Sequence, residues 1–179
     1  VNMTGGKLVM NKNSGLLLNT NDDQGIDGNA IKLIVNGDDA TITANGSNQI
    51  SGDIDFTKGT ITVANGASLT SGDIAMKSEN AKIDLLGKLN TNVNGSGNLC
   101  FKNSAANVSG NVTGSNLTFD TDHSLSKAIG GTISNITALN VNKGTLTYDK
   151  DAGSIGNVSV AGGAGLDIGT CLLYTSPSP

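Results

Sequence analysis

Residues 41–46 read TITANG, and residues 60–66 read TITVANG. Both stretches lead into the same continuation, SGDI, at residues 51–54 and 71–74. The order of the residues is therefore repeated after about 20 positions, whereas two strands of a β-hairpin would follow each other within a short turn in mirrored order. Repetition in one direction stacks equivalent strands in parallel, and this predicts the coils of a solenoid.

The repeat is expected to continue along the chain. KGTLT at residues 143–147 matches KGTIT at residues 58–62, which predicts a third copy. A simpler element, two apolar residues separated by one other residue, recurs with steps of 20, 25, 18, 22 and 19 residues. The pairs taken as equivalent are Ile54/Phe56, Ile74/Met76, Leu99/Phe101, Leu117/Phe119, Leu139/Val141 and Val158/Val160. Steps that drift around one value indicate coils whose loops absorb differences in length.

Within each coil the local pattern favours strands. Residues 60–63, TITV, alternate polar and apolar side chains, and their β-branched content suits a pleated sheet. Asn-Gly pairs at 36–37, 45–46, 65–66 and 94–95 are expected at corners, because both residues tolerate positive φ. Residues 117–129 form the longest stretch without Gly, Asn or Pro and are expected to be a loop or a helical turn leaving the coil.

These patterns predict an all-β fold, a right-handed parallel β-helix with coils of about 20 residues. We assign residues 1–170 to this repeat region, with residues 1–29 less regular than the rest. The absence of an obvious cap at either end is typical of a piece of a longer rod.

The composition of the chain narrows the range of functions that we expect of it. The chain holds 25 Gly and 23 Asn, only 3% aromatic residues and no Trp. Its net charge is −4 and all 11 basic residues are Lys, so neither a basic nucleic-acid-binding surface nor an arginine clamp for carboxylate or phosphate is expected. No apolar run approaches the roughly 20 residues that a membrane-spanning helix needs.

The last nine residues differ from the rest. Residues 171–179 read CLLYTSPSP, which contains both prolines of the chain but no Gly or Asn. All nine residues resemble the translation of a transposase adapter used in sequencing libraries. We therefore expect the native sequence to be interrupted near Thr170, which leaves Cys100 as the single native cysteine and no intrachain disulfide.

Residues 144–169, GTLTYDKDAGSIGNVSVAGGAGLDIG, together with the Asn-rich corners, resemble the passenger regions of autotransporters. The similarity covers most of residues 40–170 and is greatest to surface cell antigens of rickettsia-like bacteria. Large adhesins exported by two-partner systems have the same style of repeat. The resemblance implies an extracellular or cell-surface rod with an adhesive or shielding role. Its partner would be an unknown ligand on a host cell, the matrix or another bacterium, and membrane attachment would come only through a C-terminal barrel outside these residues.

Polysaccharide-cleaving enzymes of the same fold are the main alternative. Such enzymes need carboxylates for calcium or for acid–base chemistry. Asp22-Asp23 and Asp38-Asp39 lie in turn-like contexts and are interpreted as solvated corners. Asp53 and Asp73 occupy equivalent positions and are expected to stack one coil apart, where a cation could join them. We nevertheless expect these two carboxylates to be hydrated rather than to bind a metal ion.

His123 is the single histidine and lies between Asp122 and Ser124. Three contiguous residues cannot by themselves form a Ser-His-Asp catalytic geometry. We therefore expect no enzyme activity and assign no catalytic, cofactor-binding or metal-binding residues.

Three further signals are weaker. Residues 162–168, GGAGLDI, are similar to a calcium-binding nonapeptide repeat, but no tandem copy follows. Threonine pairs at 41/43, 60/62 and 145/147 fall on one expected repeat position, as in ice-binding solenoids, with a break at Lys82 and Asp84. Cys100, between Leu99 and Phe101, is interpreted as a small buried apolar residue.

Overall fold

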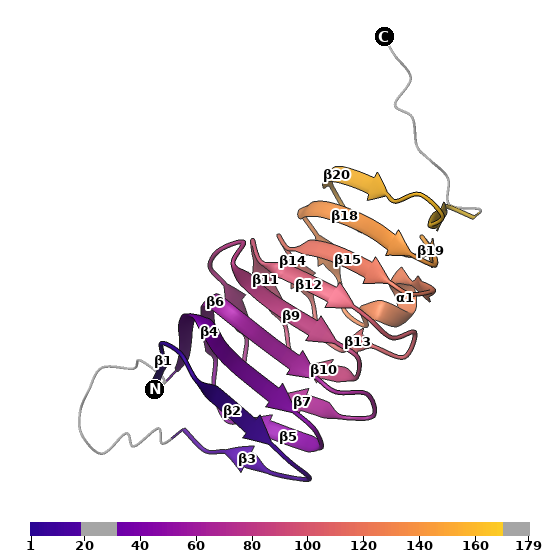
Figure 1. Cartoon of the computed structure of the whole chain (residues 1–179). Helices are drawn as coiled ribbons and strands as arrows, with labels where there is room; N and C mark the ends of the chain where they lie inside the picture. Colours follow the sequence, from indigo (N-terminus) through magenta and orange to yellow (C-terminus); the bar gives the residue numbers. More distant parts are fainter. Residues whose placement is uncertain (19–31, 170–179) are drawn as a thin grey trace.

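The computed structural model describes residues 1–18 and 32–169, and these residues form a parallel β-solenoid of about seven turns with roughly 20 residues per turn. Every pair of neighbouring strands in it is parallel, as in the pairing of β4 with β6. In Figure 1 the axis rises from the N-terminus to the C-terminus, and the strands of the near sheet run from left to right. This is the sense of a right-handed helix, so the predicted fold class is confirmed.

Each coil contributes strands to three faces. The first face contains β1 (Asn2–Met3), the first halves of β4 (Leu33–Ala44) and β6 (Ile54–Val63), β8 (Ile74–Met76), β11 (Val93–Gly95), β14 (Val112–Thr113) and β17 (Ile133–Ser134). The second face contains β2 (Lys7–Met10), the second halves of β4 and β6, β9 (Ala81–Leu85), β12 (Asn98–Phe101), β15 (Asn116–Asp120), β18 (Ile136–Lys143) and β20 (Ile155–Val160).

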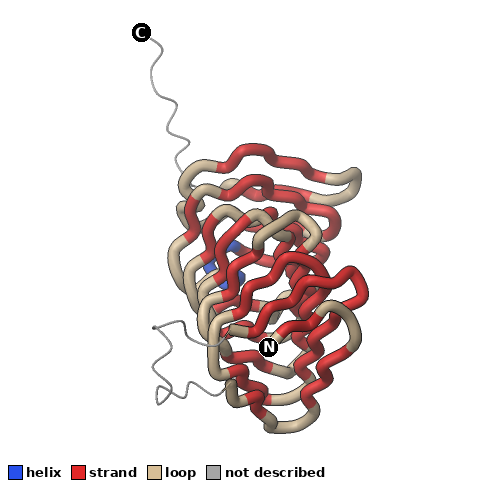
Figure 2. The backbone as a smooth tube through the Cα atoms, turned by 90° about the vertical axis from the view of Figure 1, so that its left-hand side faces the viewer, coloured by secondary structure: helices blue, strands red, loops and turns tan. Residues whose placement is uncertain are grey.

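The third face is divided between two sheets. One sheet contains β3 (Gly15–Leu16), β5 (Ser47–Ile50), β7 (Ser68–Thr70), β10 (Lys88–Asn90) and β13 (Asn107–Val108). The other contains β16 (His123–Ser124), β19 (Thr145–Thr147) and β21 (Gly165–Asp167). Figure 2 shows the strands of successive coils stacked above one another around a common interior.

Strand alternation builds one continuous core. In β9 the residues Ala81, Ile83 and Leu85 are buried, while the side chains between them face outward. Parallel pairing places Ile61, Ile83 and Leu99 in one inward column of the second face. Like residues stack on like residues because each coil repeats the period-two pattern of its neighbour.

The apolar pairs taken as equivalent in the sequence belong to two different columns. Ile54/Phe56 and Ile74/Met76 pair with each other on the first face. Leu99/Phe101 and the later pairs lie on the second face, where their true predecessor is Ile83/Leu85. The assignment across the 25-residue step was therefore wrong, because that step goes around one coil of ordinary length, from Ile74 to Val93, and then on to the next face.

The third copy of the repeat was wrong for the same reason. Residues 58–62 lie on the second face, whereas Thr145–Thr147 form β19 on the third face and pair with β21. A short strand with alternating polar and apolar residues can lie on any face of the solenoid, so the local pattern does not show which face it occupies.

The prediction that residues 117–129 leave the coil as a loop or a helical turn is correct only in part, because β15 and β16 occupy much of this stretch. Leu125–Ala128 form α1, with the Ser124 hydroxyl oxygen accepting a hydrogen bond from the Lys127 N–H at its N-cap. It separates the two sheets of the third face and, among the described residues, is the only helix (Figure 2).

Candidate functional site

The two equivalent carboxylates lie at the corner that precedes the first face, where they form a hydrogen-bonded stack. Asp53 and Asp73 are one coil apart, as predicted, and Asp53 Oδ1 accepts a hydrogen bond of 2.9 Å from the backbone N–H of Asp73. Asp73 Oδ1 in turn accepts a 3.0 Å hydrogen bond from the Asn92 side-chain amide. The carboxylates therefore join adjacent coils by hydrogen bonds to the chain itself.

Two residues that the sequence reasoning missed extend this stack. Asn92 Oδ1 accepts a 2.9 Å hydrogen bond from the Asn111 N–H, and Asn111 Oδ1 accepts one of 2.8 Å from the Thr132 N–H. We call Asp53, Asp73, Asn92 and Asn111 the corner ladder. Its signal in the sequence is an Asp or Asn directly before the first inward residue of the first face, at steps of 20, 19 and 19 residues.

Replacing Asn92 with alanine is expected to lower the free energy of unfolding by about 1 kcal/mol, because two inter-coil hydrogen bonds are lost. Asn94→Ala is the matched control, since this exposed side chain lies two residues further along the chain, in β11. Its effect should stay within about 0.5 kcal/mol. Urea denaturation of both variants measures the difference, and equal losses would contradict a stabilising role for the ladder.

The side chain of His123 is buried in the interior of the solenoid, on β16. Its ring occupies the inward column that Leu146 and Leu166 occupy in the next coils. Its Nδ1 accepts a 2.9 Å hydrogen bond from the Ser124 N–H, and its Nε2 lies 2.7 Å from the Ala106 carbonyl oxygen. Nδ1 also lies 3.1 Å from the Ser124 carbonyl oxygen, so backbone groups contact both ring nitrogens.

The side chains of Asp122 and Ser124 form hydrogen bonds with groups other than the His123 ring. Asp122 Oδ1 accepts a 2.8 Å hydrogen bond from the Thr145 N–H, and the Ser124 hydroxyl caps α1. All three residues line a shallow open cavity of about 380 Å³. Its other lining residues are Ser104, Lys127, Thr145 and Thr147. The structure thus brings the three residues together but joins neither the Ser124 hydroxyl nor the Asp122 carboxylate to the imidazole.

Asp149 binds the first turn of α1 from the next coil. Its carboxylate accepts hydrogen bonds from the N–H and the hydroxyl of Ser126. Burial raises the pKa of Asp149, but these hydrogen bonds, its own backbone N–H and the nearby Lys127 charge outweigh that effect and hold the pKa below its ordinary value.

Ser126→Ala removes the hydroxyl hydrogen bond and is therefore expected to move the pKa of Asp149 back towards its ordinary value. A lowered folded-state pKa stabilises the fold above the unfolded-state pKa, and this contribution is lost as the pH falls through the folded-state value. In the variant the loss should begin at higher pH. Carboxyl chemical shifts followed by NMR titration measure the pKa, and an unchanged value would refute the assigned role of Ser126. Ser104→Ala, at another residue that lines the cavity, is the control.

The outward surface of the second face is mostly polar and uncharged. Thr41 pairs with Thr60 and Thr43 with Thr62, so four threonines form an array two coils deep. The third pair, Thr145 and Thr147, lies on the third face and does not continue this array. The prediction that all three pairs share one position was therefore wrong, and the break at Lys82 and Asp84 is confirmed by their pairing with Thr60 and Thr62.

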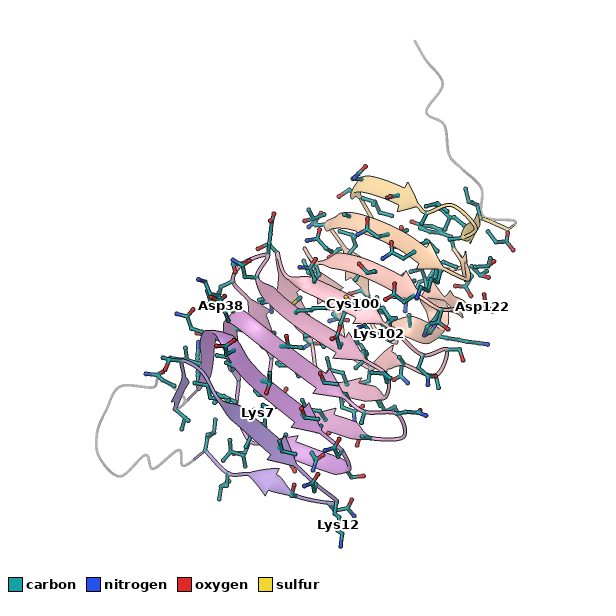
Figure 3. All side chains as sticks on the ribbon, viewed as in Figure 1. Lys7, Lys12, Asp38, Cys100, Lys102 and Asp122 are labelled. Atoms are coloured by element: carbon teal, nitrogen blue, oxygen red, sulfur yellow. The ribbon has the colours of Figure 1, made fainter. Side chains whose placement is uncertain are left out.

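A small charge cluster follows the threonine array. Asp84 lies 3.4 Å from the Lys82 ammonium and 3.3 Å from the Lys102 ammonium. Cys100 pairs directly with Asp84 in the neighbouring strand, close to Lys102 (Figure 3). The thiol is buried as predicted, although it lies in the outward column, between the inward residues Leu99 and Phe101. Burial, followed by the negative charge of Asp84, raises the pKa of the Cys100 thiol, which keeps it protonated and unreactive.

The remaining candidates do not assemble a cluster of ligands. Asp38 and Asp39 lie exposed in β4, where the register with β6 shifts. Asp167, in the stretch similar to the calcium-binding repeat, accepts a 2.8 Å hydrogen bond from the Gly169 N–H. Within residues 1–18 and 32–169, no group of three or more His, Cys, Asp or Glu side chains could hold a metal ion. Asp22, Asp23 and the adapter-like residues 171–179 lie outside the described residues.

The fold and its surface define a class of protein, the parallel β-solenoids. Comparison with protein-family models, with curated proteins and with solved structures finds no match to the chain. In the part of the chain that the structure describes, no helix has the length and apolar character needed to cross a bilayer.

Proposed function

We propose that the chain is a segment of an exported rod, displayed on a bacterial surface, which acts in adhesion as the passenger region of an autotransporter-type protein. The observation that carries the proposal is the regular stack of coils, which presents one long polar face. Solenoids of this kind hold extended surfaces at a fixed spacing, and partners bind along them.

The corner ladder supports a structural rather than a catalytic use of the carboxylates. Asp53 and Asp73 each accept a hydrogen bond from a backbone or amide group of the neighbouring coil. A polysaccharide-cleaving site would instead need its carboxylates free for a cation or for acid–base chemistry. The outward threonines and the Lys82–Asp84–Lys102 cluster offer hydroxyl and charged groups on one flat surface. Such a surface suits a polar macromolecular ligand bound without chemical change.

Adhesion is tested by immobilising the purified chain and measuring its binding to fibronectin, laminin, collagen and heparin. Saturable binding to at least one of these probes is expected. A Thr60→Glu/Thr62→Glu variant on the second face should weaken it, while Asn94→Glu/Thr113→Glu on the first face should not. An absence of binding to every probe would count against an adhesive role in this segment.

Polygalacturonate is the substrate that tests the enzyme alternative. No release of unsaturated or reducing ends is expected. Turnover that disappears in Asp53→Ala or Asp73→Ala would overturn the proposal. Surface display is tested with antibodies on intact bacteria that express the gene, where the signal should be lost after external protease treatment.

A further inference from the structure

The chain contains four Asn-Gly pairs, and the fold gives them different surroundings. Asn65-Gly66 lies in the corner between β6 and β7, where the Ala67 N–H donates to the Ala64 carbonyl oxygen at 3.0 Å and closes a turn. Both residues of the pair are exposed, and a Cβ added at Gly66 would meet no atom within 4 Å. Among the described residues the Gly66 N–H has no acceptor, so its nitrogen is open to the side chain of the preceding asparagine.

The other three pairs lie against the preceding coil. At Gly37, Gly46 and Gly95 an added Cβ would overlap a backbone carbonyl oxygen of that coil, so the two chains approach closely there. The Gly46 N–H also donates to Asn48 Oδ1 at 2.9 Å. Because the Val93 N–H donates to the residue directly before β14, alternation along β11 directs the Gly95 N–H towards the same strand. These three glycines are therefore less free to move than Gly66.

The side chain of Asn65 is held in a way that assists attack on its carbonyl carbon. The Asn103 side-chain amide donates a 3.2 Å hydrogen bond to Asn65 Oδ1. Asn103 Oδ1 accepts a 2.9 Å hydrogen bond from the Ala105 N–H, which sets the direction of its amide group. A donor at Asn65 Oδ1 stabilises the negative charge that develops there when a nucleophile adds to the carbonyl carbon. At Asn45 the amide nitrogen is engaged instead, since it donates to Asn11 Oδ1 at 2.9 Å.

Water reaches the Asn65-Gly66 pair from an open cavity of about 290 Å³ that these two residues help to line. Lys88 lines the same cavity. Its positive charge favours anions nearby, including a deprotonated backbone nitrogen and the oxyanion that forms on the side chain. The corner therefore combines an unhindered nucleophile, a polarised carbonyl group and access for solvent.

We propose that Asn65 is a site of spontaneous deamidation, in which the Gly66 nitrogen attacks Asn65 Cγ and Asn103 assists through its hydrogen bond. The Gly66 nitrogen gives its proton to water and forms a bond to Cγ. The bond from Cγ to Nδ2 then breaks, and the amide nitrogen takes a proton from water and leaves as ammonia. Water opens the resulting cyclic imide at either carbonyl group, which gives aspartate or isoaspartate. Both products add a negative charge to the corner, and isoaspartate also lengthens the main chain by a methylene group.

Peptide mapping by mass spectrometry tests the choice of site, and it does not depend on the adhesive function. The purified chain is incubated at mildly alkaline pH, sampled over time and digested with trypsin, which cleaves after lysine. Fragment 59–77 contains Asn65 as its single asparagine, while fragments 33–58 and 89–102 contain the other three pairs. Deamidation of Asn65 should be at least about fivefold faster than at those pairs, because they must first lose a hydrogen bond or a close contact.

The same measurement in concentrated guanidinium chloride removes the effect of the fold. All four Asn-Gly pairs should then react at similar rates, because each asparagine is followed by a residue without a side chain. Equal rates at all four pairs in the folded chain would overturn the proposal. A preference for Asn65 that persists in the unfolded chain would also overturn it, since the cause would then be the local sequence.

Asn103→Asp tests the assisting hydrogen bond. Aspartate keeps an oxygen for the Ala105 N–H but cannot donate to Asn65 Oδ1, so deamidation of Asn65 should slow by about threefold or more. Asn107→Asp is the control, because it makes the same change of charge in the same coil at a side chain that donates to the Ala105 carbonyl oxygen. It should leave the rate at Asn65 nearly unchanged. Circular dichroism checks that both variants keep their strands, and an equal rate in Asn103→Asp and the unmodified chain would refute the role of Asn103.

Discussion

Phe119→Ala is expected to lower the free energy of unfolding by about 3–5 kcal/mol, the largest loss that a single side chain of this solenoid should produce. Phe119 is fully buried and stacks on Phe101 of the preceding coil, with ring centroids 4.7 Å apart and planes inclined by 7°. The His123 ring packs its edge against both phenylalanines, at 5.6 and 5.7 Å. Truncation therefore leaves a cavity between two coils and removes aromatic contacts within one apolar cluster.

Equilibrium urea denaturation followed by far-ultraviolet circular dichroism measures this loss. The control is Thr118→Ala, the outward neighbour in the same strand, whose effect should stay within about 0.5 kcal/mol. A loss below about 1 kcal/mol for Phe119→Ala would show that the coils repack around the cavity, and would contradict the close packing of the interior.

Gly95→Ala is expected to cost more than about 2 kcal/mol. Gly95 ends β11 with φ of 102°, a conformation that side chains rarely adopt, and an added Cβ would overlap the backbone carbonyl oxygen of Met76 in the preceding coil. The strain of the backbone angle alone costs about 1–3 kcal/mol, and the overlap forces two paired strands apart.

Gly66→Ala separates the two causes. Gly66 also has positive φ, 75°, but an added Cβ would meet no atom within 4 Å. Its loss should therefore reflect the backbone angle alone and be clearly smaller than that of Gly95→Ala. Thermal unfolding of both variants provides the comparison, and equal shifts in Tm would show that the contact with Met76 adds nothing.

The two expected effects describe how the rod is held together. The phenylalanine stack stabilises the interior of neighbouring coils, and the glycine permits their backbones to approach at a corner. Neither residue belongs to the outward surface of the second face, so both substitutions should weaken the rod without changing the surface that we propose binds a ligand. Binding measured below the unfolding temperature should therefore remain.

The repeat and the alternation were sufficient to predict the class of fold. Stretches such as residues 60–63 show which side chains face inward, because a strand has a period of two wherever it lies. The absence of Gly, Asn and Pro over residues 117–129 indicated the helical turn at α1, but it did not show that β15 and β16 occupy much of the same stretch. The stacking of Asp53 on Asp73 followed from their equivalent positions in the repeat.

The candidate sites were less predictable. Asn92 and Asn111 complete the corner ladder, but asparagine is so frequent in this chain that their spacing alone did not distinguish them. The burial of His123 was hidden because its neighbours Asp122 and Ser124 are polar, and only the neighbouring coils show that its position is a leucine column. A side chain's partners on other coils lie about 20 residues away and leave no local signal.

The sequence by itself determined a solenoid of parallel strands, because hydrophobic alternation and the repeat order depend only on the chain. Only the tertiary structure decided which face each strand occupies. It placed Ile74/Met76 on the first face and Leu99/Phe101 on the second. It likewise placed Thr60/Thr62 on the second face and Thr145/Thr147 on the third. The physical reason is that strands on all three faces obey the same period of two. Their assignment to a face is set by where the corners turn and by which strand of the neighbouring coil supplies the hydrogen bonds.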